Sequence, residues 1–164
     1  MNGKVRKGRK MRKRLIIGMS GASGALFTIE LLKQLQQYKE IIETHLIVTK
    51  GAEMTLEQET DYTLEQLYAF ADEVHDNYNI GAGPASGSYR TMGMIVIPCS
   101  MKTLAGIVSG YSDNLVLRAA DITLKERRKK ISLPENGLSR YGNLSNNRCL
   151  CWQEYIMIIW KRNS

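Results

Sequence analysis

The sequence has few of the residues that cross-link small extracellular folds or hold metal ions. Its 164 residues include three cysteines, three prolines and two histidines. Cys99, Cys149 and Cys151 are too few and too unevenly spaced for a disulfide framework, which favours a reducing, cytoplasmic setting. Because His45 and His75 are the only histidines, the two C-terminal cysteines lack a convincing set of zinc co-ligands. The sequence therefore predicts no metal site.

Long apolar runs are missing as well. None approaches the ~20 residues of a membrane-spanning helix. The basic N-terminus leads only into the short apolar run Leu15–Met19, with no cleavage site after it, so we predict neither a membrane span nor a secretory signal. A chain of this length fits one domain with a substantial core.

Basic charge is concentrated at the two ends of the chain. Residues 1–14 contain eight lysines and arginines and no acidic residue, whereas residues 15–124 contain six basic and thirteen acidic side chains. A nucleic-acid-binding domain usually presents a basic face on its folded body, so this distribution argues against binding of RNA or DNA. We predict a basic disordered extension over residues 1–14.

A glycine-rich turn follows the first apolar run. Gly18, Gly21 and Gly24 recur at intervals of three, and an amphipathic segment begins directly after them. Glycines allow a backbone to approach a ligand closely, and a helix N-terminus offers N–H groups and a positive dipole end to a phosphate. The spacing matches neither the dinucleotide nor the Walker A pattern. The turn predicts a phosphate site, with tight packing of small residues as the alternative.

Strand and helix patterns alternate along the rest of the chain. Apolar runs predict strands at 15–19, 44–49 and 94–100, and helical spacing predicts helices at 26–38, 51–59, 63–70, 101–110 and 115–128. A long Gly/Ser loop lies within residues 75–90. This alternation predicts a parallel α/β sheet with helices on both faces, in which ligands bind at the carboxyl ends of the strands. Hydroxyl groups follow all three predicted strands, and we expect them to converge on a phosphorylated ligand: Ser20, Ser23, Thr49, Ser100 and Thr103.

Five motifs carry a resemblance to a known family. They are Gly-Met-Ser-Gly-Ala-Ser-Gly-Ala at 18–25, Glu-Thr-Asp at 59–61, Ala-Ser-Gly-Ser at 85–88, Ile-Pro-Cys-Ser-Met-Lys-Thr-Leu-Ala-Gly at 97–106, and Arg-Ala-Ala-Asp-Ile-Thr-Leu-Lys-Glu-Arg-Arg at 118–128. In this order and spacing they resemble the UbiX/Pad flavin prenyltransferases, once described as aromatic-acid decarboxylases. The resemblance covers about residues 14–130.

The resemblance implies a Rossmann-like, flavodoxin-type fold that binds FMN and assembles into a homo-oligomer, typically a dodecamer. Members of the family transfer a dimethylallyl group from dimethylallyl phosphate to reduced FMN, and the prenylated flavin serves a UbiD-type decarboxylase. No metal is implied. Dimethylallyl phosphate leaves as a phosphate dianion, so cations and hydroxyls that stabilise this charge lower the barrier.

The resemblance also implies residue roles. Ser23 and Glu59 are expected at the reacting centre. The residues expected to bind FMN are Gly21, Ala22, Ser23, Thr49, Ser100, Met101, Lys102 and Thr103; those expected to bind the prenyl phosphate are Ser86, Gly87, Arg118 and Lys125. Spacing alone leaves Arg118 and Lys125 open as solvated surface charges, and Glu59 as a helix-end charge. Cys99 is expected to be a small buried residue without a nucleophilic role.

Past Lys130 the resemblance ends. Where the family has a Pro-Arg-Glu segment, Pro134 is followed by Glu135 and Asn136. We therefore divide the chain into the extension 1–14, an FMN-binding domain 15–130 and a divergent segment 131–164, and we hypothesise a frameshift or early end near residue 131.

Two alternatives to the prenyltransferase stay open. One is an inactive remnant that has lost the family's C-terminal site residues. The other is a flavin-dependent cysteine decarboxylase of the same fold, but such enzymes carry a catalytic histidine on the helix after the first strand, and residues 25–38 contain none.

Overall fold

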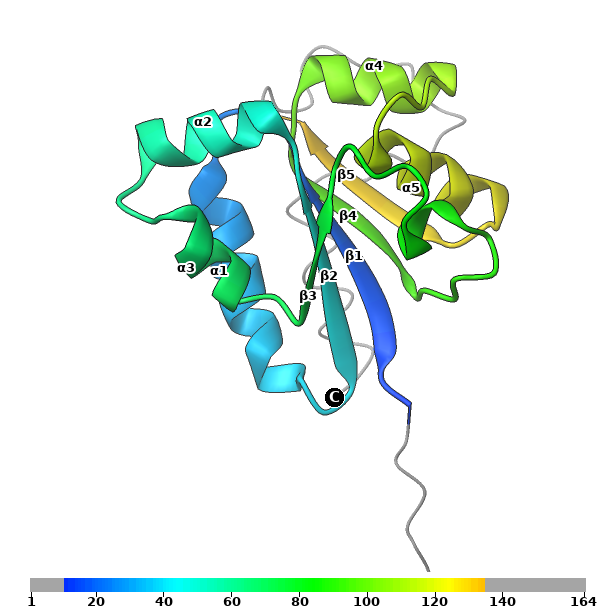
Figure 1. Ribbon diagram of the computed structural model, residues 1–164, viewed down its shortest axis with the longest axis horizontal. Coiled ribbons are helices and arrows are strands. Elements are labelled where there is room, and N and C mark those ends of the chain that lie inside the picture. The colour runs from blue at the N-terminus through cyan, green and yellow to red at the C-terminus, as the bar shows by residue number, and fades with distance from the viewer. Residues whose placement is uncertain (1–10, 135–164) are drawn as a thin grey trace, which may run out of the picture.

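Five parallel strands form the centre of the structure, in the order β3-β2-β1-β4-β5 (Figure 1). The computed structural model describes residues 11–134. Every neighbouring pair of strands is parallel. The strands are β1 (Lys13–Met19), β2 (Ile42–Val48), β3 (Glu73–Asp76), β4 (Gly93–Cys99) and β5 (Lys129–Pro134).

Helices cover both faces of this sheet (Figure 1). Three pack on one face: α1 (Ala25–Leu35), α2 (Lys50–Glu59) and α3 (Leu64–Ala69). Two pack on the other: α4 (Met101–Ser109) and α5 (Leu115–Lys125). Two short 3₁₀ turns, η1 (Gln36–Tyr38) and η2 (Gly83–Ala85), complete the described elements. The Rossmann-like, flavodoxin-type α/β fold that we expected is confirmed.

The central strand β1 shows why the sheet is buried on both sides. Leu15, Ile17 and Met19 point into the apolar cluster formed with α1, α2 and α3. Ile16, between them, points into the cluster formed with α4 and α5. Successive side chains of a strand face opposite sides, so a strand covered on both faces is a continuous apolar run.

The ends of the domain differ from the predicted boundaries. β1 begins at Lys13, two residues before the predicted start, because Arg12 and Arg14 are anchored to the fold. Arg12 forms an ion pair with Asp72 at 2.6 Å, and Arg14 lies 3.8 Å from Glu43. At the other end, β5 continues to Pro134, past the boundary we placed at residue 130. The rest of the predicted extension and of the divergent segment, residues 1–10 and 135–164, lies outside the described residues.

Strand β3 was missed in the sequence. It has only four residues, and its burial pattern is almost entirely exposed, so it carries no apolar run or alternation. Among the strands of residues 11–134 it is an edge strand, and its neighbour is β2.

The strand order reverses direction at β1. The chain moves from β1 outward to β2 and β3, then returns to add β4 and β5 on the other side. In open α/β sheets this switch point, at the carboxyl ends of the strands, is where ligands bind. The glycine turn after β1 and Ser100 after β4 both lie there. In the described part of the chain, no helix is long and apolar enough to cross a membrane.

Candidate functional site at the carboxyl ends of the strands

Glu59, the last residue of α2, lies at the start of α1. One oxygen, Oε2, accepts hydrogen bonds from the Gly24 and Ala25 N–H groups at 2.9 and 3.1 Å. The other, Oε1, accepts a hydrogen bond from the Ser23 hydroxyl at 2.5 Å. A carboxylate therefore holds the helix N-terminus where we expected a phosphate, and the expected pair Ser23–Glu59 is in direct contact.

The carboxyl group of Glu59 is held in its ionised form. The hydrogen bond from Ser23, followed by those from the Gly24 and Ala25 backbone, lowers the pKa of Glu59 below its ordinary value. Both Ser23 and Glu59 are exposed, so a bound molecule can reach them. Because the Ser23 proton is directed at Glu59, the lone pairs of its Oγ remain available to accept a hydrogen bond from a ligand.

Gly24 makes this turn possible. It is the N-cap of α1 with φ 106°, in the left-handed region that favours glycine. A Cβ at this position would also lie 2.7 Å from the ring of Phe27.

The hydroxyls that follow β2 and β4 are helix caps. The Thr49 hydroxyl accepts a hydrogen bond from the Ala52 N–H at 3.2 Å and caps α2. The Ser100 hydroxyl accepts one from the Thr103 N–H at 3.2 Å, caps α4, and donates to the Thr103 hydroxyl at 3.0 Å. Thr49, Ser100 and Thr103 are half-buried, so they keep some access to solvent beside the switch point. Helices α1, α2 and α4 thus all begin at the carboxyl ends of the strands.

Ser20 does not belong with these accessible hydroxyls. It is buried, donates to the Pro98 carbonyl at 2.8 Å and accepts from the Ser100 N–H at 2.7 Å. We expected Ser20 to face a ligand, but its role is to tie the end of β1 to the end of β4.

Gly21 is fixed by packing. A Cβ there would lie 2.9 Å from the backbone Cα and C of Gly51, so the turn after β1 and the start of α2 touch backbone to backbone. The neighbouring Ala22 is buried. The glycine spacing predicted a close approach of the backbone to a ligand, but at Gly21 the close neighbour is the backbone of Gly51. Gly51 was not among the expected site residues, and its only signal in the sequence is a small residue two positions after the cap of α2.

The first turn of α4 carries Met101 and Lys102. Met101 is half-buried and packs against the cluster under α4 and α5. Lys102 is exposed, and no described residue forms an ion pair with it. It can contribute a positive charge to the switch point.

The residues expected to bind the prenyl phosphate lie elsewhere. The Gly87 carbonyl accepts a hydrogen bond from Arg128 at 2.7 Å, and Arg128 immediately precedes β5. A Cβ on Gly87 would approach the Glu126 carboxylate at 2.9 Å. Ser86 is exposed, and its hydroxyl lies 2.9 Å from that of Ser88. This loop therefore packs at the amino ends of the strands.

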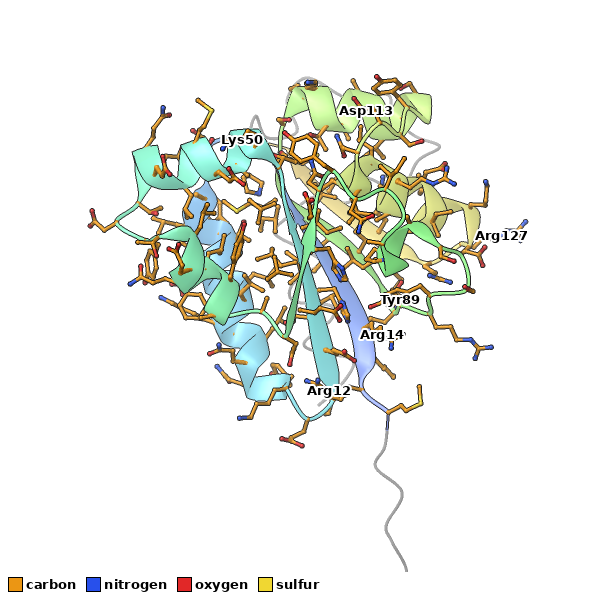
Figure 2. All side chains as sticks on the ribbon, viewed as in Figure 1. Arg12, Arg14, Lys50, Tyr89, Asp113 and Arg127 are labelled. Carbon is orange, nitrogen blue, oxygen red and sulfur yellow. The ribbon has the colours of Figure 1, made fainter. Side chains whose placement is uncertain are left out.

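Figure 2 makes the separation visible. Lys50, next to Thr49, is at one end of the sheet, whereas Tyr89 and Arg14 are at the other. β1 spans seven residues between the two ends, which at ~3.3 Å per residue is about 20 Å. Within one chain, Ser86 and Gly87 therefore lie at the opposite end of the sheet from Ser23.

Arg118 and Lys125 lie near opposite ends of α5. Arg118 is half-exposed, with Asp121 3.9 Å away. Lys125 is exposed and immediately precedes Glu126, whose carboxylate lies beside Gly87. A cleft of about 540 Å³ lies at another place, between the end of α1 and the start of β3, and is lined by none of the expected site residues.

The sequence matches the Flavoprotein family over residues 4–148. The chain belongs to the Flavoprotein family. The match continues past Lys130, where we ended the resemblance. The chain is 52% identical over 116 residues to the flavin prenyltransferase UbiX of Escherichia coli K12, which covers 71% of this chain.

Solved structures similar to this Flavoprotein-family chain extend the comparison. AnUbiX, in complex with FMN and dimethylallyl pyrophosphate, is 46% identical with a TM-score of 0.75, covering 79% of this chain and 69% of that one. A dodecameric FMN-dependent UbiX-like decarboxylase from Escherichia coli O157:H7 is 50% identical with a TM-score of 0.73, covering 75% and 67%. The chain spans 61% of the length of the Escherichia coli K12 relative.

Proposed function

We propose that this protein is a flavin prenyltransferase, which transfers a dimethylallyl group from dimethylallyl phosphate to reduced FMN. The observation that carries the proposal is the contact of Ser23 with an ionised Glu59 at the switch point of the sheet. The 52% identity to a flavin prenyltransferase supports the same activity. The product would serve a UbiD-type decarboxylase, and the few cysteines support a cytoplasmic setting.

The described residues fit FMN at the carboxyl ends of β1 and β4. Glu59 already occupies the N-terminus of α1, so the helix ends that remain for a phosphate are those of α2 and α4. Thr49, Ser100, Thr103 and Lys102 offer hydroxyls and a positive charge there, a donor set suited to an anionic group. FMN would supply the nucleophilic nitrogen and carbon that take the dimethylallyl group.

Ser23 and Glu59 would accept a proton beside the flavin. Glu59 Oε1 holds the Ser23 proton, which leaves Ser23 Oγ as an acceptor toward the ligand. A proton released as the new bond forms can pass to Ser23 Oγ while the Ser23 proton passes to Glu59. The Glu59 carboxylate is within hydrogen-bond reach of Ser23 Oγ, which is the geometric requirement for a general base.

The leaving phosphate would be held by the Gly/Ser loop of a neighbouring copy of the chain. Ser86 and Gly87 are at the opposite end of the sheet from Ser23, so one copy cannot hold both ends of the reaction. Lys125, Arg90 and Arg127 are exposed near this loop and can stabilise the departing charge. The dodecameric UbiX-like relative supports assembly of several copies.

The test combines flavin retention with turnover. The protein is loaded with FMN, desalted and examined by visible spectroscopy, then reduced and given dimethylallyl phosphate, and the flavin is analysed by mass spectrometry. We expect stoichiometric flavin and a mass gain of one dimethylallyl unit. The Glu59→Gln variant should retain flavin but lose the mass gain, and Glu57→Gln, on the same helix, should behave as the parent. A colourless protein, or bound flavin of unchanged mass, contradicts the proposal.

A further inference from the structure

Both histidines of the chain meet one glutamate at the edge of the sheet. His45 Nδ1 lies 2.9 Å from His75 Nε2 and 3.4 Å from Glu73 Oε2. The other carboxylate oxygen, Glu73 Oε1, lies 3.9 Å from His75 Nε2. The pairing of β2 with β3 places His45 opposite Glu73, and His75 two residues further along the same strand. All three side chains therefore share one face of the sheet.

These distances match the spacing of ligands around a small divalent metal ion. Nitrogen and oxygen ligands bind Zn²⁺ at about 2.0–2.1 Å, so tetrahedral neighbours lie roughly 3.3 Å apart. The three ligand atoms here all lie within 4.8 Å of one another. Two histidines and one carboxylate form a typical three-ligand zinc set, with a fourth position left for water.

Glu43 and Arg14 lie behind the ring of His45. Glu43 Oε1 lies 3.5 Å from His45 Nε2, and Arg14 Nε lies 3.8 Å from Glu43 Oε2. This carboxylate lies at the ring nitrogen opposite to Nδ1, the nitrogen that faces His75 and Glu73. A carboxylate behind a histidine ligand is a common arrangement at zinc sites.

Both histidine side chains are also shielded from solvent. The side chain of His45 is 0% exposed and that of His75 is 9% exposed. The Tyr89 hydroxyl, 3.0 Å from His45 Nδ1, closes the side of the cluster that faces the Gly/Ser loop.

We propose that His45, His75 and Glu73 bind one Zn²⁺ ion, with Glu43 as a positioning residue. The ion would fasten the short edge strand β3 to β2. The cluster lies along the middle of β2, away from the carboxyl-end site, so the inference does not depend on the proposed function. It departs from our sequence-based prediction of no metal site. That prediction considered the histidines only together with cysteines, because the pairing of β2 with β3 was not visible in the sequence.

The experiment measures Zn²⁺ binding by the full-length, untagged chain after chelator treatment, using calorimetry and metal analysis. We expect one Zn²⁺ per chain. Affinity should fall at least about a hundredfold in Glu73→Gln and His75→Asn, and roughly 10–100-fold in Glu43→Gln. Asp76→Asn, the next residue of β3 on the opposite face, is the matched control and should bind as the parent. Because Glu73 and Asp76 are exposed, the Glu73→Gln and Asp76→Asn variants test binding without disturbing the core.

Cobalt substitution separates this site from the cysteines. Co²⁺ bound by histidine and carboxylate gives visible bands without the sulfur-to-cobalt charge-transfer band of thiolate ligands, and these bands should be absent in His75→Asn. Binding that is equal in the parent and Glu73→Gln, a thiolate charge-transfer band, or no stoichiometric binding overturns the proposal.

Discussion

At the scale of a single residue, the Glu59 carboxylate makes two kinds of contact. It accepts hydrogen bonds from the N–H groups at the start of α1 and from the Ser23 hydroxyl. The resemblance singled out Glu59 for the site. Its contact with the start of α1 was not predictable from sequence, since Gly24 and Glu59 are 35 residues apart. The hydroxyl pattern also did not reveal that Ser20 is buried. A serine that hydrogen-bonds two strand ends and a serine that faces a ligand cannot be distinguished in a sequence.

The pH dependence of stability provides a test at this scale. The folded-state pKa of Glu59 is lowered, chiefly by Ser23, so its contribution is present above the unfolded-state pKa and is lost as the pH falls through the folded-state pKa. We expect Glu59→Gln to reduce the free energy of unfolding by about 1 kcal/mol at neutral pH, as for other groups at helix N-termini. Urea unfolding at neutral pH and near pH 3 should show this difference shrinking in acid. Glu57→Gln serves as the control, and a pH-independent difference would contradict the assignment.

At the scale of elements, the turn after β1 and the start of α2 are pressed together at Gly21 and Gly51. Because a Cβ on Gly21 would meet backbone atoms at 2.9 Å, no side-chain movement can relieve the clash. We expect Gly21→Ala to lower stability by about 1–3 kcal/mol, the usual cost of overpacking, and to weaken flavin retention. Gly81→Ala, where a Cβ would lie 3.5 Å from Asn79 Oδ1, is the control. A Gly21→Ala protein with unchanged thermal stability and flavin content would show that the two turns can separate freely.

Strong periodic patterns explain which elements were predictable. β1, β2 and β4 each contain a short apolar run, and Thr63 with Gln66 forms a capping box at the start of α3, within the helix predicted over residues 63–70. β3 was missed because a mostly exposed edge strand of four residues carries neither an apolar run nor an alternating pattern. β5 begins in the charged run Lys129-Lys130, which resembles a helix end more than a strand.

At the scale of the whole molecule, the expected site residues fall into two groups at opposite ends of one sheet. Ser23 and Glu59 lie at the carboxyl ends of the strands, and Ser86 and Gly87 lie at the amino ends. The motifs could not reveal this separation. They give the order of the residues along the chain, but not whether each loop lies at the amino or the carboxyl ends of the strands. A reaction that uses both groups requires contact between copies, which symmetric oligomers provide.

Complementation between two inactive variants tests that requirement. Glu59→Gln removes the strand-end group, and Lys125→Ala removes an exposed cation near the Gly/Ser loop. Each variant alone should lose prenylation. When equal amounts are dissociated and reassembled together, random pairing leaves about a quarter of the sites with both residues intact if neighbouring copies share each site. The mixture should therefore recover about a quarter of the parent activity, whereas the same variants mixed without dissociation should stay inactive. If each chain instead used its own loop, every site would carry one defect and reassembly would restore nothing.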